Sequence, residues 1–474
     1  MDPFIHIFLV DNEAYFYDVN RNEIIKISDE SFKILEGIKN NDSNAIKLND
    51  ELLQLKEKGY LSEHRAKSIE HPTTNSLDTL LSRNLSLLTI QLTQNCNLRC
   101  SYCPYTSNDG TNRTHSNKSI DISTAQKAIL FLKEHSVDSE YVTIGFYGGE
   151  PILEIKTLKE IVIYSKNIFY GKKVKYTITT NGTLLDNEML KFLEENNFSL
   201  VFSMDGPQEI NDMNRKYAGS SNSVFSNVIN KINFIYKSLP KLFKSTLINM
   251  VIDPKYGLDT YENMFEQYEA LSKIMVSTSM LDDGYKTTKN TISKEFLEQY
   301  ASRKKDYMEY LFSGNNPKKP FINMSFYGSL FLKSIEELVN GLYPSSGLGE
   351  TSCPSGQCIP GNTRLMVDVD GNFYPCERVS EEGQINIIGN VDNGLSKEKT
   401  NHILNIGKNG GNNCLECFAI RYCNICVKRY EKKLLNKTSN MINECRDCKA
   451  SFHDYLIEYI RFNNDYMEVK HGEK

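Results

Sequence analysis

Several features that mark other classes of protein are missing from this chain of 474 residues. No apolar run approaches the roughly 18–20 residues that span a bilayer. The first ten residues contain neither a basic segment nor a small-residue cleavage site, so they do not resemble a signal peptide. The formal net charge is −5, which argues against a nucleic-acid binder that relies on a general basic field. These absences favour a cytoplasmic globular protein.

Cysteine is absent from residues 104–352, although the chain has 12 cysteines. Three of them lie within residues 96–103 and the others within residues 353–448. Structural cysteines scattered through a core would not leave such a gap, and a reducing compartment does not maintain disulfides. The grouping therefore predicts two regions of metal ligands.

The first group has the spacing Cys-x3-Cys-x2-Cys and consists of Cys96, Cys100 and Cys103. Three thiolates that converge on one point suit a four-iron cluster in which one iron has no protein ligand. Ferredoxin spacings instead supply four cysteines, one for each iron. An iron without a protein ligand predicts chemistry at the cluster rather than electron storage alone. Taken alone, the three cysteines are also compatible with a zinc site.

The pattern of apolar residues predicts three main parts. Residues 1–70 begin with a strand hairpin and continue with helices, as in a winged helix. Residues 71–85 have the composition of a linker. Residues 86–300 alternate strands and helices, which predicts an α/β fold with a partial (β/α)6 barrel. A helical bridge (301–350) leads to a cysteine-rich part (351–474), for which we expect metal rather than an apolar core to hold the fold together.

The predicted barrel strands carry short polar motifs at their carboxyl ends. In folds of this kind the reactive groups lie at those ends of the strands. Each motif alone is compatible with an ordinary turn, but four motifs in order, each at a strand end, predict one shared site. The six predicted strands cover residues 86–92, 141–146, 175–180, 199–204, 246–252 and 273–280.

This combination of motifs resembles the radical S-adenosylmethionine (SAM) superfamily. Tyr102 matches the aromatic residue that precedes the third cysteine there, and residues 148–151 match a Gly-Gly-Glu-Pro motif. The resemblance implies that SAM binds the open iron of a 4Fe–4S cluster and is cleaved to a 5′-deoxyadenosyl radical, which removes a hydrogen atom from an unactivated carbon. The residues that it assigns to cofactor binding are Tyr102, Gly148, Gly149, Glu150, Pro151, Thr180, Asn181, Ser203, Asp205 and Arg215.

The C-terminal cysteines resemble the SPASM domain of peptide-modifying radical SAM enzymes. One departure is visible, because two residues separate Cys423 from Cys426 where the family usually has three. The resemblance implies two auxiliary 4Fe–4S clusters, and thus three clusters in all. Cys448 is then a spare thiol, inert or hydrogen-donating, unless Cys445 and Cys448 exchange roles. Two zinc ribbons are the alternative. The implied ligands are Cys353, Cys358, Cys376 and Cys426 for the first auxiliary cluster, and Cys414, Cys417, Cys423 and Cys445 for the second.

Residues 1–70 resemble the domain that recognises a leader peptide in many maturases of ribosomally made peptides. Such a domain binds the leader as an added strand at a sheet edge, and residues 23–27 are the expected docking edge. A DNA-binding winged helix and a merely stabilising extension are the alternatives, and the segment is not notably basic.

Together these parts resemble a radical SAM/SPASM peptide maturase. The implied reaction is a cross-link in a precursor peptide, with a thioether between a cysteine sulfur and a carbon favoured over a carbon–carbon cross-link or epimerisation. The implied partners are a leader-bearing precursor and an electron donor such as flavodoxin or ferredoxin, with no nucleic acid and no membrane. Formylglycine formation on a sulfatase is less expected, because Glu377 stands where those relatives carry aspartate. A non-enzymatic iron–sulfur scaffold is the alternative of another class.

Overall fold

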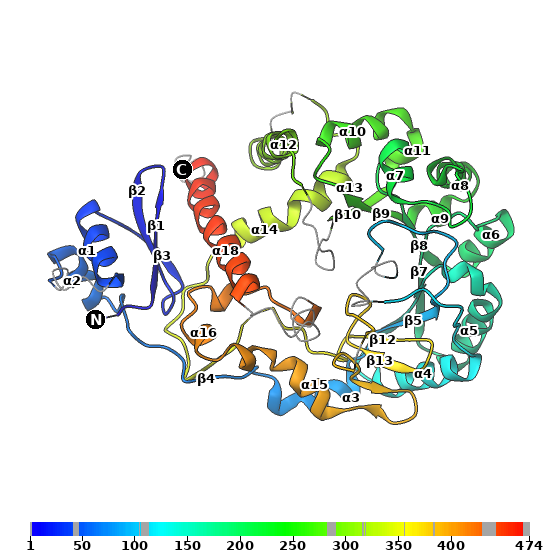
Figure 1. Cartoon of the computed structure of the whole chain (residues 1–474), viewed down its shortest axis with the longest axis horizontal. Helices are drawn as coiled ribbons and strands as arrows, with labels where there is room; N and C mark the ends of the chain where they lie inside the picture. Colours follow the sequence, from blue (N-terminus) through cyan, green and yellow to red (C-terminus); the bar gives the residue numbers. More distant parts are fainter. Residues whose placement is uncertain are drawn as a thin grey trace. The chain divides into compact units, whose positions relative to one another are not determined.

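The computed structural model describes residues 2–40, 47–103, 105, 113–281, 291–314, 317, 319–354, 356–382, 384–428 and 442–467. The chain divides into two compact units, which we describe one at a time (Figure 1). The larger unit consists of Ser76–Ile335 and Ile359–Thr400, and the smaller unit of Met1–Asn75, Glu336–Cys358 and Asn401–Lys474.

The larger unit is built on a sheet with the strand order β10-β9-β8-β7-β6-β5-β12-β13-β14-β15 in the described part of the chain. Adjacent strands from β5 to β10 pair in parallel, which confirms the predicted α/β fold with its partial barrel. The parallel strands are β5 (Leu87–Thr93), β6 (Tyr141–Gly148), β7 (Lys173–Thr180), β8 (Phe198–Ser203), β9 (Thr246–Ile252) and β10 (Met275–Met280).

Helices cover the outer face of this sheet (Figure 1). In α4 (Ile122–His135) the Asp121 carboxylate caps the helix by accepting hydrogen bonds from two backbone N–H groups, and Ala125, Ile129 and Leu132 form part of its buried face. The same apolar spacing produces the neighbouring helices, which are α5 (Ile155–Ile168), α6 (Asn187–Glu195), α7 (Gln208–Asn214), α8 (Val224–Ser238), α9 (Pro240–Lys244), α10 (Leu258–Gln267) and α11 (Glu269–Lys273).

Four short strands extend the sheet beyond β5, and the sequence did not predict them. The strand β12 (Arg364–Val367) pairs in parallel with β5, and β13 (Asn372–Tyr374), β14 (Gly389–Asn390) and β15 (Gly394–Leu395) follow in antiparallel order. Such two- to four-residue strands are too short for a reliable alternating pattern. Their consequence is that residues 364–395 belong to the barrel sheet.

The segment expected to be a linker, residues 71–85, contains the helix α3 (Leu77–Arg83). Leu77 and Leu81 are buried and lie four residues apart, so they share one face of the helix. The polar residues before them gave this segment the composition of a loop, and two apolar positions were too few to reveal the helical period.

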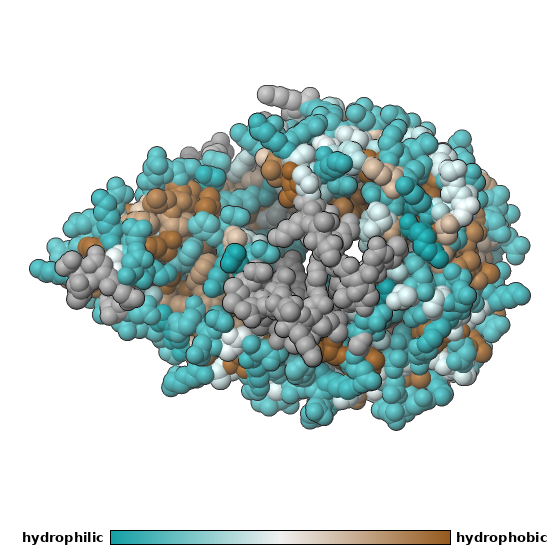
Figure 2. Space-filling view, in the orientation of Figure 1, coloured by the Kyte–Doolittle hydropathy of each residue, from teal (hydrophilic) through white to brown (hydrophobic). Residues whose placement is uncertain are grey.

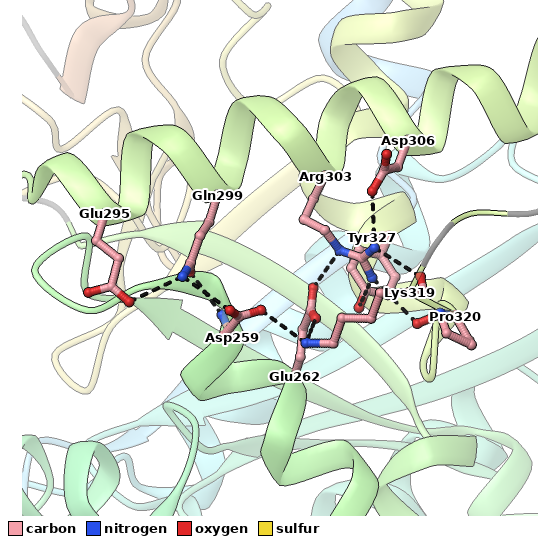
Figure 3. Close-up of polar contacts among 9 residues, drawn as sticks. All are labelled: Asp259, Glu262, Glu295, Gln299, Arg303, Asp306, Lys319, Pro320 and Tyr327. Atoms are coloured by element: carbon pink, nitrogen blue, oxygen red, sulfur yellow. Dashed lines mark hydrogen bonds and ion pairs between the residues drawn. The ribbon is translucent and has the colours of Figure 1, made fainter.

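A network of charged side chains joins α10, α12 (Lys294–Ser313) and the segment that precedes α13 (Met324–Tyr327) (Figure 3). Arg303 Nε donates a hydrogen bond of 2.8 Å to Glu262 Oε1, and both side chains are buried. Lys319 Nζ lies 2.6 Å from Glu262 Oε2 and 2.9 Å from Asp259 Oδ1. Arg303 also donates to the Tyr327 hydroxyl at 3.0 Å. The network therefore pairs each charge that folding removes from water.

Replacing Arg303 by methionine is expected to lower the free energy of unfolding by about 3–5 kcal/mol, because the buried Glu262 carboxylate loses its main partner. Urea denaturation of the full chain measures this change. The control is Lys305→Met on the same helix, whose exposed amine lies 3.9 Å from Glu309 and which we expect to change stability by at most about 1 kcal/mol. Equal losses for the two variants would contradict a stabilising role of the network.

The smaller unit begins with an antiparallel sheet in the order β1-β2-β3, with β1 (Ile5–Val10), β2 (Glu13–Asp18) and β3 (Glu23–Ile27). Asp11 and Asn12 turn the chain between β1 and β2 with positive φ values of 50° and 68°. The helices α1 (Asp29–Lys39) and α2 (Asp50–Glu57) follow, capped by the side chains of Ser28 and Asn49. These elements match the predicted hairpin and helices.

The long helix α18 (Ile442–Phe462) packs in one apolar core with the N-terminal sheet. Phe8 and Tyr17 from the sheet, Ile420 from the cysteine-rich segment, and Phe452 and Leu456 from α18 are buried in this core. The expectation that this part lacks an apolar core was therefore wrong. The core residues come from segments far apart in the sequence, so no local periodicity revealed them.

Several short elements complete the described part of the chain. The two-residue strands β4 (Ser68–Ile69) and β11 (Thr351–Ser352) pair in parallel within the smaller unit. The other short α-helices are α14 (Lys333–Asn340), α15 (Lys397–Leu404) and α16 (Asn412–Leu415).

The face shown in Figure 2 is mostly hydrophilic, with apolar residues in small patches, one of them over the N-terminal strands. Among the helices that the structure describes, none combines the length and the apolar character needed to cross a bilayer.

Candidate active site

The loop that carries Cys96, Cys100 and Cys103 begins directly after β5, at the carboxyl end of that strand. Backbone hydrogen bonds hold it against residues 214–218: the Arg99 N–H donates to the Lys216 carbonyl at 2.7 Å, and the Ser101 N–H donates to the Asn214 carbonyl at 2.9 Å. The loop is thus fixed by main-chain contacts on both sides of Cys100.

The three thiols lie near one another and are largely shielded from water. Burial raises the pKa of the Cys96 thiol to about 12 and that of the Cys100 thiol to about 11. Such thiols keep their protons at neutral pH until a metal displaces them. In the described part of the chain, no three His, Cys, Asp or Glu side chains are arranged as a group that could hold a metal ion. Three soft sulfur donors on one fixed loop nevertheless fit an iron–sulfur cluster.

The Gly148-Gly149-Glu150 segment runs against the residues that precede the cysteine loop. The Gly149 N–H donates to the Thr93 carbonyl at 2.7 Å, and the Glu150 N–H donates to the Asn95 carbonyl at 2.8 Å. A Cβ on Gly149 would lie 2.1 Å from the Asn95 oxygen, and one on Gly148, whose φ is 143°, would lie 2.3 Å from the Thr93 oxygen. This approach of two backbones therefore requires glycine at both positions.

The Glu150 side chain joins the ends of β6 and β7. Its carboxylate accepts hydrogen bonds from Thr180 Oγ1 at 2.6 Å, from the Asn181 N–H at 2.8 Å and from the Ile152 N–H at 3.1 Å. Burial raises the pKa of Glu150, and these hydrogen bonds oppose the shift. Pro151 follows as the first residue of a short helix, where its missing N–H is harmless. The carboxylate thus has partners within the protein.

A chain of amides and hydroxyls connects the end of β7 to the cysteine loop. Asn181 Nδ2 donates to Asn97 Oδ1 at 2.9 Å and lies 3.8 Å from Cys96 Sγ. Asn97 Nδ2 donates in turn to Thr183 Oγ1 at 2.8 Å. Through Asn97, the third-strand motif and the cysteine loop hold each other in position.

Asp205 lies just beyond the end of β8, which ends at Ser203, and it is fully buried. Its carboxylate accepts a hydrogen bond from the Tyr102 hydroxyl and lies 3.5 Å from Arg215 Nη1, which also donates to that hydroxyl. Burial and the nearby carboxylate raise the pKa of Tyr102 well above its usual range. Arg215 is therefore paired with Asp205 within the protein, and Tyr102 joins the cysteine loop to this pair.

The structure thus brings the four predicted motifs to one edge of the sheet, at the ends of β5, β6, β7 and β8. Contacts between side chains or backbones link each motif to the cysteine loop or to its neighbour. Their roles toward SAM remain predictions.

A second polar cluster, formed by Gln91, Tyr105, Arg113 and Glu381, was missed by the sequence analysis. Arg113 is 2% exposed, and its Nε lies 3.0 Å from Glu381 Oε1. Gln91 Nε2 donates to the Tyr105 hydroxyl and to Glu381 Oε1, each at 2.7 Å. Arg113 also donates to the carbonyls of Glu377 and Val379. It thereby fixes the segment after Cys376 against the barrel, although these residues stand far apart in the sequence.

The C-terminal cysteines are divided between the two units. Cys376 follows β13 in the larger unit, whereas Cys353, Cys358 and Cys426 belong to the smaller one. Cys353 Sγ donates to the Pro354 carbonyl at 3.2 Å, and Cys358 is exposed. The remaining five cysteines line a single cavity of the smaller unit, whose empty volume of about 500 Å³ includes open solvent: Cys414, Cys417, Cys423, Cys445 and Cys448.

Comparison with known proteins agrees with this geometry. Residues 90–268 match the sequence model of the radical SAM superfamily. The chain is 25% identical, over 81% of its length and 95% of the relative's, to a cysteine-type anaerobic sulfatase-maturating enzyme of Clostridium perfringens. It is 20% identical to the radical SAM cyclopropyl synthase TigE of Paramaledivibacter caminithermalis, over 90% of this chain and 89% of that protein.

Among solved structures, native anSMEcpe with bound AdoMet and Cp18Cys peptide has a similar fold. The TM-score is 0.56 at 23% identity, and the match covers 81% of this chain and 99% of that one. The cysteine loop, the strand-end motifs and the match over residues 90–268 lead to one conclusion. Residues 90–268 thus form a radical SAM domain, and the chain is similar over most of its length to a cysteine-type anaerobic sulfatase-maturating enzyme.

Proposed function

We propose that this protein is a radical SAM enzyme that modifies a peptide, and that it installs a thioether between a cysteine sulfur and a carbon of a ribosomally made precursor. The observation that carries the radical chemistry is the cysteine loop at the end of β5, which is hydrogen-bonded to the motifs at the ends of β6 and β7. A peptide substrate is supported by the relatives, one of which has a solved structure with bound peptide.

The predicted residues form three groups in this proposal. Cys96, Cys100 and Cys103 would hold an iron–sulfur cluster, which together with SAM would supply a 5′-deoxyadenosyl radical. Gly148 and Gly149 let this segment pack directly on the backbone of residues 93–95, which places the motif beside the cysteine loop. The remaining predicted contacts are Tyr102, Glu150, Pro151, Thr180, Asn181, Ser203, Asp205 and Arg215.

Thioether formation removes two hydrogens from the substrate, and both can be accounted for. One leaves as a hydrogen atom to the adenosyl radical, and the other leaves as the thiol proton when the sulfur–carbon bond forms. One electron remains and needs an acceptor. Iron–sulfur clusters accept electrons over a wide range of potentials, and we assign this role to two auxiliary clusters held by the C-terminal cysteines. An electron donor such as flavodoxin or ferredoxin would reduce the first cluster.

A second candidate function is formylglycine formation, as in the sulfatase-maturating relatives. The structure places Glu377 directly after Cys376, and its carbonyl accepts a hydrogen bond from the buried Arg113. A carboxylate at this position is a candidate base for either reaction, since both need a substrate thiol or hydroxyl to lose a proton.

We further propose that the N-terminal sheet binds the leader of the precursor. In the described part of the chain β3 pairs with β2 alone, so its outer edge is the open end of the sheet. An extended peptide can add to such an edge through main-chain hydrogen bonds. Ile24 and Ile25 are partly exposed on β3 and offer apolar contacts to the added strand.

Reaction of the reduced protein with SAM and a leader-bearing, cysteine-containing precursor tests the proposal. We expect a product lighter by two hydrogens, with one cysteine no longer alkylated by iodoacetamide and no reaction with an aldehyde-trapping hydrazide. The same core peptide without the leader is the matched control and is expected to react more slowly. A hydrazide-reactive product identifies formylglycine, two hydrogens lost with all thiols intact identify a carbon–carbon bond, and one deuterium gained from heavy water identifies epimerisation. Each of these outcomes contradicts the thioether.

A further inference from the structure

The cavity in the smaller unit holds one more cysteine than a 4Fe–4S cluster needs. Five thiols line it, and most of the other lining side chains are apolar, among them Ile406, Ala419, Ile420 and Ile425. A cluster of this type takes four thiolates, one for each iron. Soft sulfur donors in an apolar shell fit such a cluster well. The fifth thiol therefore requires an explanation.

The two candidates for the extra position lie on the same helix. Cys445 and Cys448 are three residues apart in α18, so their side chains share one face. Both face the cavity. Cys445 lies near Cys414 and Cys417, and Cys448 lies near Cys417 and Cys423. Each of the two thiols therefore lies beside two of the other three cysteines.

Asn424 distinguishes the environments of the two thiols. The Cys448 thiol donates a hydrogen bond of 2.8 Å to Asn424 Oδ1, and Cys448 is 5% exposed. An amide oxygen accepts a hydrogen bond from a protonated thiol, but it has no hydrogen to donate to a thiolate. Asn424 thus stabilises Cys448 in its protonated form, the form that a cysteine has when it is not bound to iron.

We propose that Cys445 and Cys448 are alternative ligands of one iron in the second auxiliary cluster, with Cys414, Cys417 and Cys423 as its fixed ligands. This inference rests on the proposed function, which places a cluster in the cavity. In the exchange one Fe–S(Cys) bond breaks and another forms, and the proton of the incoming thiol passes to the outgoing one. No electron is gained or lost. The protein then has two ligation states, one with Cys448 bound to the iron and one with Cys445 bound to it, in which Cys448 is protonated and bonded to Asn424.

The test compares Cys445→Ala, Cys448→Ala and the double variant, all full-length, reconstituted and purified without oxygen. Iron and acid-labile sulfide are counted, and the reduced clusters are characterised by electron paramagnetic resonance. We expect each single variant to keep the iron of the unmodified protein but to differ from the other in its resonance spectrum. We expect the double variant to lose between about one and four irons per chain, as the cluster loses one ligand or is lost. If the double alanine variant does not fold, the test is repeated with a variant that has serine in place of both cysteines.

Loss of iron from one single variant alone would overturn the inference, because that cysteine would then be the fixed ligand and the other would not bind the cluster. Full iron in the double variant would overturn it as well. Cys414→Ala is the control for the cluster itself. If the unmodified protein holds iron at the first site only, or if Cys414→Ala loses none, then the auxiliary cluster of the proposed function fails, and that result differs from a failure of ligand exchange.

Discussion

Replacing Cys96, Cys100 and Cys103 together by alanine is expected to abolish the formation of 5′-deoxyadenosine from SAM. The three thiols are the predicted protein ligands of the cluster, and without them no iron remains to bind SAM. The loss should be complete rather than partial, because the remaining groups of the site do not replace a one-electron donor. Chromatographic assay of 5′-deoxyadenosine with dithionite as reductant measures the change, and the iron count is expected to fall by about four per chain.

A change in the same loop that spares the thiols separates ligand loss from damage to the loop. Ser101→Ala removes an exposed hydrogen bond of 3.0 Å to Asn214 Oδ1 but leaves the three cysteines in place. This variant is expected to keep its iron and to form 5′-deoxyadenosine. Undiminished cleavage by the triple variant would remove the basis of the radical SAM site, and a zinc-loaded protein without iron would do the same.

Gly149→Ala is expected to reduce SAM cleavage by about 100-fold, because displacements near 1 Å at a reacting centre have effects of that size. The added Cβ would lie 2.1 Å from the Asn95 oxygen and 2.6 Å from the Asn95 carbonyl carbon. Both atoms belong to the backbone, so no side chain can rotate away. Asn95 directly precedes Cys96, and the strain therefore moves the cysteine loop. The free energy of unfolding is expected to fall by about 1–3 kcal/mol.

The matched control for this substitution is Gly219→Ala. An added Cβ there meets no atom within 4 Å, and the backbone does not need a positive φ. We expect unchanged activity and stability within about 0.5 kcal/mol. The rate of 5′-deoxyadenosine formation and the free energy of unfolding in urea are compared between the two variants. Equal activity in the two variants would show that the contact between Gly149 and Asn95 does not position the cluster loop.

The sequence predicted the parallel strands of the barrel well because each is a compact apolar run bounded by turn residues. The observed β9 (Thr246–Ile252) has the predicted bounds, and the others differ by only a few residues. The strands β12 to β15 have two to four residues each, and their pairing depends on partners far away in the chain. The helix α18 was missed because its apolar side contacts the N-terminal sheet, and the polar residues and cysteines between its apolar positions hide the helical period.

For the site, too, the sequence predicted residues with a local spacing better than residues that only the fold brings together. Motifs with a fixed local spacing, such as Cys96 to Cys103 or Gly148 to Pro151, were found from the sequence. Asn97 was not singled out, although it links the cysteine loop to the end of β7, because an asparagine between two cysteines carries no distinctive pattern. The pair of Arg113 and Glu381 was beyond the reach of sequence reasoning, since only the fold brings these residues to 3.0 Å.

The shared core of the smaller unit has a consequence for how this unit folds. Phe8 and Tyr17 lie roughly 440 residues before Phe452 and Leu456 along the chain, so their contacts close a very long loop. Contacts between such distant residues form late, whereas the barrel between them can fold through contacts between nearer segments. Because Cys445 and Cys448 of α18 line the five-cysteine cavity, this cavity is complete only after the loop has closed.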